Sequence, residues 1–305
     1  MRLKPQVIYR QAYGRYGVAA FNVFTAEQVR GVFAGASGVN VPVIIQVTPA
    51  AGKYMGQQLL QGMIAAAERE YPQASIAVHL DHGDTERCLD AVASGFYDSV
   101  MIDASHEPFE RNVALPKQIV DRAHEKGIAV EAELGVLSGV EDDRAGGEAR
   151  HTDPAQAAEF VGRTGCDSLA VAVGTSHGAY KFTGAMALNL GVLSRVQGAL
   201  PRFPLVLHGA SGVPREEVAR INSAGGTLKT GSRGITPEEV QGAIRRGVVK
   251  VNIATDLRLL WTRVCREFFR DAPEMFDPAI PGRTYMQELE HLVRQKCREL
   301  IVEGA

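Results

Sequence analysis

Residues 75–82 read "SIAVHLDH", an apolar run that ends in an aspartate and a histidine and is followed by a glycine at position 83. Short runs rich in β-branched residues are typical of buried strands, but packing alone does not explain the His-Leu-Asp-His ending. Seven similar runs recur along the chain, with helical patterns between them. The eight runs cover residues 17–24, 41–48, 75–82, 99–105, 128–135, 168–177, 204–211 and 248–255.

This order of elements predicts an α/β fold. Runs this apolar suit parallel strands that are covered by helices, and eight strand-then-helix units over about 250 residues describe a TIM (β/α)8 barrel. Helix-start signals support the division: Thr25 with Gln28 forms a capping-box pattern, and Asp153 precedes a proline. We expect the barrel to carry an extra C-terminal helical segment. The alternative is an open doubly wound sheet.

Composition sets the broad class. The 305 residues suit a single domain spanning 1–305, and 33 basic against 35 acidic residues leave a net charge of −2. This balance gives no reason to expect a nucleic-acid or membrane partner. The four cysteines lie far apart, with no Cys-x-x-Cys pair, no secretion signal is apparent and no run reaches the roughly 18 apolar residues of a membrane span. We expect a cytoplasmic protein.

Polar groups end most of the strands. In a TIM barrel these ends meet at one face, so His82, His177 and His208, each next to a glycine, should converge. Three neutral imidazoles that leave one coordination position open are typical of a catalytic zinc site. Asp103 and Glu133 would bind a second cation, orient the ligands or make structural hydrogen bonds; the sequence leaves these alternatives open.

Two loops favour phosphate binding. "HGASG" (208–212) and "NIATD" (252–256) follow strands seven and eight, where TIM barrels often bind phosphate. Backbone groups of Gly209 and Ser211, with the Thr255 hydroxyl, can cradle a phosphate. Gly178 and Lys181 add a further glycine and a positive charge. Ordinary turn chemistry is the alternative.

Residues 138–151, "SGVEDDRAGGEARH", form a polar, glycine-rich stretch without periodicity. We expect a loop here, either a lid that carries function or a solvated acidic segment.

Six motifs together resemble a known family: "HLDHG", "MIDASH", "EAELG", "GTSHGAYK", "LHGASGVP" and "KVNIATD", in this order. They resemble the class II, zinc-dependent fructose-bisphosphate aldolases and their tagatose-bisphosphate relatives, over nearly the whole chain. The resemblance implies a TIM barrel that binds Zn²⁺ through the three histidines and acts in glycolysis or gluconeogenesis. A monovalent cation, Na⁺ or K⁺, is expected near the phosphate, and the protein is expected to be a homodimer or homotetramer.

The resemblance also assigns roles to single residues. Asp81 is implied to be one catalytic acid/base, and Glu141, eight residues beyond Glu133, is implied to be the other. The implied dihydroxyacetone-phosphate site consists of Asn22, Thr48, Gly178, Lys181, Gly209, Ser211, Asn252 and Thr255.

Two positions depart from the fructose-bisphosphate pattern. Ala254 stands where an aspartate is usual, and Met286 aligns with the arginine for the distal phosphate, with Arg283 one turn earlier. Arg283 is therefore a candidate ligand of the distal phosphate. Cleavage of tagatose 1,6-bisphosphate or another ketose 1-phosphate stays open beside fructose 1,6-bisphosphate.

Other classes are weighed against this expectation. A Schiff-base aldolase needs a buried lysine at a strand end, whereas Lys250 opens strand eight and Lys181 lies in a loop. A zinc hydrolase typically has His-x-His on one strand, but His79 and His82 are three residues apart. A sugar-phosphate binding protein without activity is the non-enzyme alternative.

Overall fold

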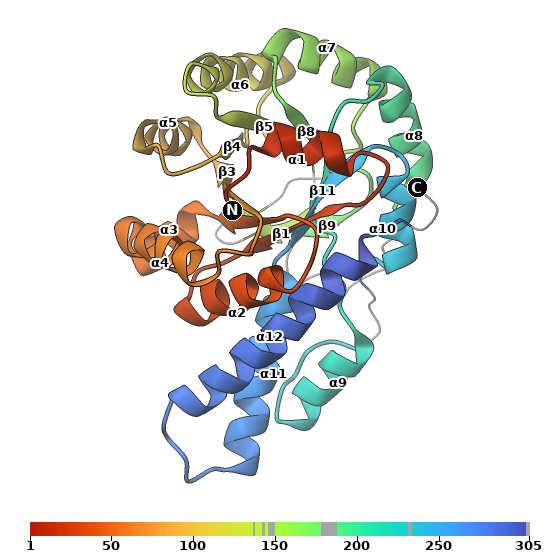
Figure 1. Cartoon of the computed structure of the whole chain (residues 1–305). Coiled ribbons are helices and arrows are strands. Elements are labelled where there is room, and N and C mark those ends of the chain that lie inside the picture. The colour runs from red at the N-terminus through yellow and green to blue at the C-terminus, as the bar shows by residue number, and fades with distance from the viewer. Residues whose placement is uncertain (137, 142–143, 146–149, 178–187, 231–233, 303–305) are drawn as a thin grey trace.

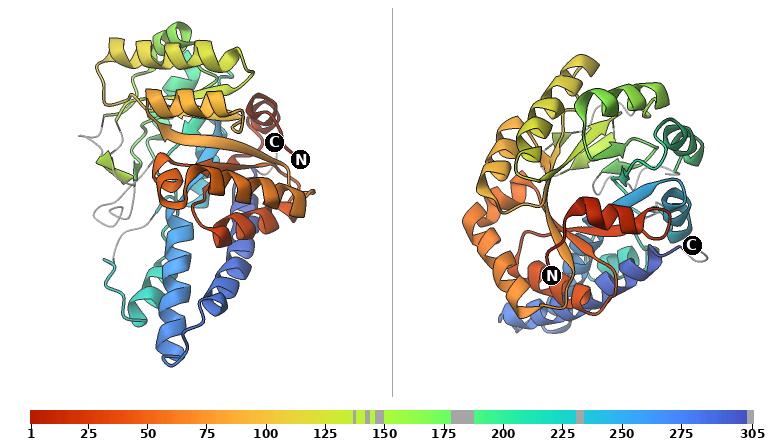
Figure 2. Two further views of the ribbon diagram at one scale, coloured as in Figure 1. Left: turned by 90° about the vertical axis from the view of Figure 1, so that its left-hand side faces the viewer. Right: turned by 45° about the horizontal axis from the view of Figure 1, so that its top comes forward.

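The computed structural model contains a closed barrel of eight parallel strands in the order β1-β11-β10-β8-β5-β4-β3-β2 (Figures 1 and 2). It describes residues 1–136, 138–141, 144–145, 150–177, 188–230 and 234–302, and of residues 138–141, 144–145 and 176–177 it describes the backbone alone. The barrel strands are β1 (Val18–Asn22), β2 (Val43–Val47), β3 (Ile76–Gly83), β4 (Ser99–Ile102), β5 (Ala129–Leu134), β8 (Ser168–Val171), β10 (Leu205–Leu207) and β11 (Val248–Ile253). The TIM barrel is confirmed, and the open sheet is excluded.

Helices surround the barrel (Figure 1). They are α1 (Pro5–Ala12), α2 (Ala26–Ser37), α3 (Pro49–Met55), α4 (Gln57–Glu70), α5 (Thr85–Ser94), α6 (Phe109–His124), α7 (Pro154–Thr164), α8 (Leu190–Ala199), α9 (Arg215–Ser223), α10 (Pro237–Ile244), α11 (Thr255–Asp271) and α12 (Ala279–Glu299). Among the described residues, no helix has the length and apolar character that a membrane span requires.

The first helix closes the N-terminal end of the barrel. Ile8, Tyr9 and Ala12 of α1 form a buried cluster with inward-facing residues of the strands, among them Ala20 and Ile44. The opposite end, where the strands finish, is therefore the open end at which side chains can meet a ligand.

Helices α11 and α12 form a hairpin that extends beyond the barrel (Figures 1 and 2). They are the expected C-terminal helical segment. α12 packs closely on α2, because Gly31 and Gly35 leave room for it: a Cβ on Gly35 would lie 2.6 Å from the Cβ of Val293. This contact fixes the base of the hairpin on the barrel.

The run 168–177 was expected to be one strand, and this expectation is wrong. Ser168–Val171 belongs to the barrel as β8, whereas Ser176–His177 forms β9 in a separate three-stranded sheet with β6 (Ser138–Glu141) and β7 (Arg144–Ala145). Between them the chain turns, with Gly174 at a φ of 94°, which ends the extended run.

The stretch 138–151 was expected to be a loop without secondary structure, and this too needs correction. β6 pairs in antiparallel fashion with β7 and in parallel with β9, so the segment brings Gly139 beside His177. Residues 137, 142–143 and 146–149 lie outside the described part of the chain.

The helix-start signals hold with one difference. Thr25 accepts a hydrogen bond from the Gln28 amide at 3.3 Å, as expected, but the Gln28 side chain binds the backbone N–H of Phe24 rather than that of Thr25. The full capping box predicted there is therefore absent. Asp153 caps α7, as its sequence context predicted.

Candidate active site

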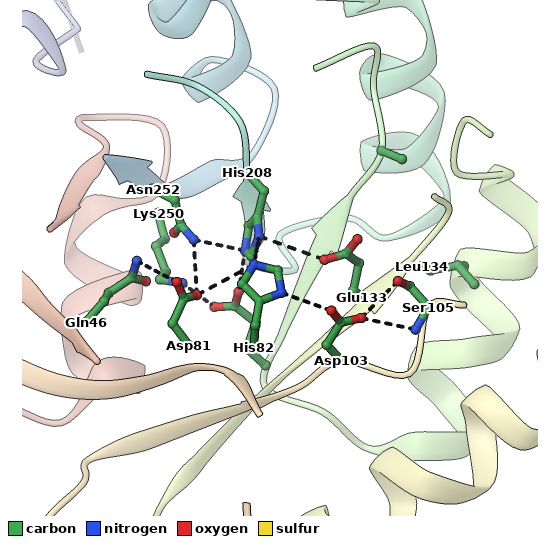
Figure 3. Close-up of polar contacts among 12 residues, drawn as sticks. Gln46, Asp81, His82, Asp103, Ser105, Glu133, Leu134, His208, Lys250 and Asn252 are labelled. Carbon is green, nitrogen blue, oxygen red and sulfur yellow. Dashed lines mark hydrogen bonds and ion pairs between the residues drawn. The ribbon is translucent and has the colours of Figure 1, made fainter. Parts of the chain in front are cut away.

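Polar side chains from separate strands meet at the open end of the barrel (Figure 3). Asp81 and His82 end β3, Asp103 follows β4, and His208 follows β10. All four side chains lie within one network, together with the residues described below. The expected convergence of these strand ends is confirmed for the described side chains.

Two imidazoles face one another, and each is held from behind by a carboxylate. Nδ1 of His82 lies 3.0 Å from Oδ2 of Asp103, and Nε2 of His208 lies 2.9 Å from Oε1 of Glu131. When these nitrogens donate their protons to the carboxylates, the other two, Nε2 of His82 and Nδ1 of His208, direct lone pairs at one another over 3.0 Å.

This arrangement fits a divalent metal. Two Zn–N bonds of about 2.0–2.1 Å in tetrahedral geometry separate their nitrogens by roughly 3.3 Å, close to the spacing of His82 and His208. A carboxylate behind each metal-ligating histidine is the common arrangement in metal sites. Oδ1 of Asp81 lies 4.0 Å from Nε2 of His82, and Oε2 of Glu133 lies 3.8 Å from Nδ1 of His208.

Two overlapping groups of side chains have the spacing to hold a metal ion. One consists of Asp81, His82 and His208, and the other of His82, Asp103 and Glu133. His177 is the third expected ligand. Its backbone belongs to β9 and pairs with Gly139, but its side chain lies outside what the structure describes.

Asp81 and His82 are consecutive, yet both side chains reach the site. Neighbouring strand residues normally point to opposite faces. Here His82 has a φ of 49°, in the left-handed region, and the pairing of β3 with β4 shifts register between Leu80 and Gly83. Gly83 makes the bend possible, because a Cβ there would lie 2.7 Å from Sγ of Cys88.

Three amides surround the buried carboxylate of Asp81. Nδ2 of Asn22 donates to Oδ2 at 2.7 Å, Nδ2 of Asn252 donates to Oδ1 at 3.3 Å, and Nε2 of Gln46 lies 3.4 Å from Oδ2. These amides supply hydrogen bonds to both carboxylate oxygens and bring no charge of their own. Asp81 is therefore held in one orientation as a group that can accept a proton.

Burial and charge shift the pKa values around the imidazoles. Burial lowers the pKa of His208 below its ordinary value, so the ring is neutral and can act as a ligand. Burial alone would raise the pKa of Asp103, but its hydrogen bonds with His82 and Ser105 outweigh that effect and lower it. The site thus combines the neutral imidazole of His208 with the ionised carboxylate of Asp103.

Below this layer lies a buried ionic group that the sequence analysis did not assign. Nζ of Lys250 lies 2.8 Å from Oε2 of Glu131 and 3.4 Å from Nε2 of His79, whose Nδ1 lies 2.7 Å from Oγ of Ser99. His79 is thus a buried core residue. Two-residue alternation is the signal that could have revealed Glu131 and Lys250, since each lies two positions before a site residue.

The expected phosphate-binding groups are described only in part. Oγ of Ser211 lies 3.3 Å from the backbone nitrogens of both Ala254 and Thr255, where α11 begins. Gly209 has a left-handed φ of 64°. The Thr48 hydroxyl accepts a hydrogen bond from the Ala51 amide and caps α3.

Other expected residues lie outside the described part of the chain or on its surface. Gly178 and Lys181 lie outside the described residues, and so does the side chain of Glu141, whose backbone ends β6. Arg283 is exposed in the first turns of α12, next to Gly282, where a Cβ would lie 3.8 Å from Cγ of Glu27 in α2.

The closed parallel barrel, with imidazoles and carboxylates at the open end, defines a TIM-barrel protein with a candidate metal centre. Comparison with known proteins then identifies the family. Residues 5–305 match the family model "Fructose-bisphosphate aldolase class-II", so the chain belongs to the class II fructose-bisphosphate aldolases, which are metal-dependent lyases.

Curated relatives agree over most of their length. The chain is 44% identical to the fructose-bisphosphate aldolase of Thermus caldophilus over 283 residues, covering 92% of this chain and 90% of the relative. It is 41% identical to that of Giardia intestinalis over 280 residues, covering 90% and 86%. Among solved structures, the YdjI aldolase of Escherichia coli K12 matches with a TM-score of 0.79 and 31% identity, over 100% of this chain and 99% of the other.

Proposed function

We propose that the chain catalyses the reversible, metal-dependent aldol cleavage of fructose 1,6-bisphosphate to dihydroxyacetone phosphate and glyceraldehyde 3-phosphate. The observation that carries this proposal is the pair of facing imidazole nitrogens of His82 and His208, 3.0 Å apart and next to the buried carboxylate of Asp81. A metal site beside a group that can take a proton is what aldol cleavage requires. Membership of the aldolase family supports the same reaction.

His82, His177 and His208 are proposed as the ligands of one Zn²⁺, with Asp103 and Glu131 orienting two of the rings. Asp103 and Glu133, which share a second group with His82, are proposed as part of the ligand shell or of a second metal position. The metal, when bound, supplies a Lewis acid toward the substrate carbonyl.

Asp81 is proposed as the base of the cleavage step. It takes the proton of the C4 hydroxyl, the C4–O bond becomes the aldehyde carbonyl, and the electron pair of the breaking C3–C4 bond stays on C3. The three surrounding amides hold the carboxylate in one orientation. Asp81 thereby receives the proton while the aldehyde departs.

The second half-reaction protonates C3. Glu141 is proposed to deliver this proton, giving dihydroxyacetone phosphate, and to remove it in the synthetic direction. The Asn252 amide, which already touches both Asp81 and His208, can donate a hydrogen bond to the enediolate oxygen. Closure of the segment that carries Glu141 would protect the enediolate from water.

The phosphate of the dihydroxyacetone half is proposed to lie where α11 begins, a helix N-terminus with backbone N–H groups and a favourable dipole. Ser211 contacts two of these groups. A monovalent cation, Na⁺ or K⁺, is proposed nearby. The proposed set of binding residues is Asn22, Thr48, Gly178, Lys181, Gly209, Ser211, Asn252 and Thr255.

One observation favours a second candidate, cleavage of a ketose 1-phosphate that lacks the distal phosphate. Arg283, the candidate for the distal phosphate, is exposed on α12 and makes no hydrogen bond or ion pair with the described residues of the site. An aldehyde without a distal phosphate would need no such arginine. Tagatose 1,6-bisphosphate carries that phosphate, as fructose 1,6-bisphosphate does, and stays a candidate because of Ala254. The chain is further proposed to form a homodimer or homotetramer.

We further propose that residues 1–305 act as one barrel domain in the cytoplasm, in glycolysis or gluconeogenesis. The cysteines support this compartment, since all four are free thiols.

A coupled cleavage assay tests the proposal. Purified protein is assayed with fructose 1,6-bisphosphate and with tagatose 1,6-bisphosphate, before and after EDTA treatment and after zinc is restored. The proposal expects turnover of the fructose substrate with the higher kcat/KM and loss of turnover in EDTA. A higher kcat/KM for tagatose 1,6-bisphosphate favours that substrate, and ligand binding without turnover of either favours a sugar-phosphate binding protein.

A further inference from the structure

The barrel interior contains an ion pair with almost no contact with solvent. Lys250 is 0% exposed and Glu131 is 1% exposed, and Nζ of the lysine lies 2.8 Å from Oε2 of the glutamate. Burying two charges costs free energy that their attraction often fails to recover, and apolar residues of similar size are frequently as stable. Stability alone is therefore a poor reason for this pair.

The strand register places the pair directly beneath the candidate metal centre. Glu131 lies two residues before Glu133 on β5, and Lys250 lies two residues before Asn252 on β11. Residues two apart on a strand point to the same face. Both members of the pair therefore form the layer below the residues that surround the facing imidazoles.

The two oxygens of Glu131 have different partners. Oε2 accepts from Lys250, whereas Oε1 lies 2.9 Å from Nε2 of His208. A lysine ammonium can only donate, so it fixes the carboxylate as an acceptor. The acceptor Oε1 favours the ring proton on Nε2 of His208, where the amide nitrogen of Asn252, at 3.2 Å, is the competing donor. With the proton on Nε2, the lone pair lies on Nδ1, the atom that faces His82 at 3.0 Å.

We propose that Lys250 and Glu131 are positioning residues that set the affinity of the site for its divalent metal. Lys250 anchors Glu131, and Glu131 holds His208 in the one tautomer and orientation that presents Nδ1 to the metal. The inference rests on the proposed metal site, but it concerns residues outside the proposed ligand set. Asp103 has the corresponding role for His82.

The main test uses full-length protein that has been stripped of metal and titrated with Co²⁺, with the visible absorption spectrum and a competing chelator as readouts. The double variant Glu131→Leu/Lys250→Met removes both charges together and so leaves no unpaired buried ion. We expect the free energy of unfolding to be unchanged or raised, while Co²⁺ affinity falls by about 10- to 100-fold. A purely structural role for the pair predicts the opposite pattern.

Ser99→Ala is the matched control. It removes the buried hydrogen bond between Ser99 and His79, whose ring lies 3.4 Å from Nζ of Lys250, and leaves the contacts of Glu131 with Lys250 and His208 in place. We expect it to lower stability and leave the Co²⁺ affinity and spectrum unchanged.

A second measurement uses the unmodified protein, so its result does not depend on whether the double variant folds. In unmodified protein labelled with ¹⁵N-histidine, we expect the NMR signals of His208 to report a proton on Nε2. A proton on Nδ1, or wild-type Co²⁺ affinity in the folded double variant, overturns the inference. Failure of the unmodified protein to bind Co²⁺ would instead contradict the proposed function.

Discussion

Nε2 of His82 and Nδ1 of His208 lie 3.0 Å apart, with the two rings edge to face at 80°. Each ring is fixed from behind by a carboxylate, so the two lone pairs meet at one point that only a cation or a proton can occupy favourably. The tertiary fold creates this relationship, since 125 residues of chain separate the two histidines. It underlies the predictions that follow.

Replacement of Asp81 by asparagine should separate metal binding from catalysis. The change keeps the shape of the side chain and removes its capacity to take a proton. We expect kcat for cleavage to fall by about 10²- to 10⁴-fold, while zinc affinity changes little because the two imidazoles remain. Parallel titration of zinc and steady-state kinetics check this. A matching loss of zinc affinity would instead identify Asp81 as a metal ligand.

Gly83→Ala should damage the site through the backbone. A Cβ at this position would lie 2.7 Å from Sγ of Cys88 and 3.1 Å from the carbonyl oxygen of Met101, so β3 must shift where it carries Asp81 and His82. We expect the free energy of unfolding to fall by about 1–3 kcal/mol, together with a loss of metal affinity. Chemical denaturation and metal titration measure the two effects.

Gly62→Ala is the control for that variant. Gly62 is exposed within α4, and a Cβ there would meet nothing within 4 Å. We expect it to stabilise the protein by up to about 1 kcal/mol and to leave metal binding intact. Equal stability of the two alanine variants would contradict the assigned role of Gly83.

His79 should make the protein less stable in mild acid. Burial, and then the nearby charge of Lys250, lower the pKa of this histidine well below its ordinary value. The unfolded chain takes up a proton there below about pH 6.5, and the folded chain does not, so the free energy of unfolding falls as the pH drops below that value. The largest slope from this group is about 1.4 kcal/mol per pH unit.

The variant His79→Gln tests the assignment. Between about pH 6.5 and pH 5, the free energy of unfolding of this variant should change less steeply with pH than that of the unmodified protein. The difference in slope should correspond to one proton, about 1.4 kcal/mol per pH unit. Denaturant titrations at several pH values provide the slopes. Identical slopes for the two proteins would show that His79 is not responsible.

Much of the fold can be predicted from the sequence, because eight apolar runs recur, most of them end in polar groups, and the ends of parallel barrel strands meet. Two parts could not be. The run 168–177 continues in β-like composition, yet the turn before Ser176 directs its end into a separate sheet. Nothing in the composition of 138–151 indicated the strand pairing that β6 makes with β9.

The sequence indicated the residues at the open end of the candidate site but not the buried residues in the layer below them. Asp81, His82 and His208 stand at strand ends, where position alone indicates function. Glu131 and Lys250 lie inside the barrel, and only their two-residue spacing from Glu133 and Asn252 indicates that they face inward. The left-handed φ of His82 arises from the register shift between β3 and β4, which depends on tertiary pairing.

Deuterium exchange into dihydroxyacetone phosphate tests the central claim most directly, because it needs only one half of the substrate and no particular aldehyde. The zinc-loaded protein is incubated with dihydroxyacetone phosphate in D₂O, and the C3 hydrogens are followed by NMR. The account predicts exchange of one C3 hydrogen, loss of exchange in EDTA, and recovery when zinc is restored. Absence of exchange with zinc bound, or exchange that persists in EDTA, would contradict the metal-dependent enediolate chemistry proposed for this site.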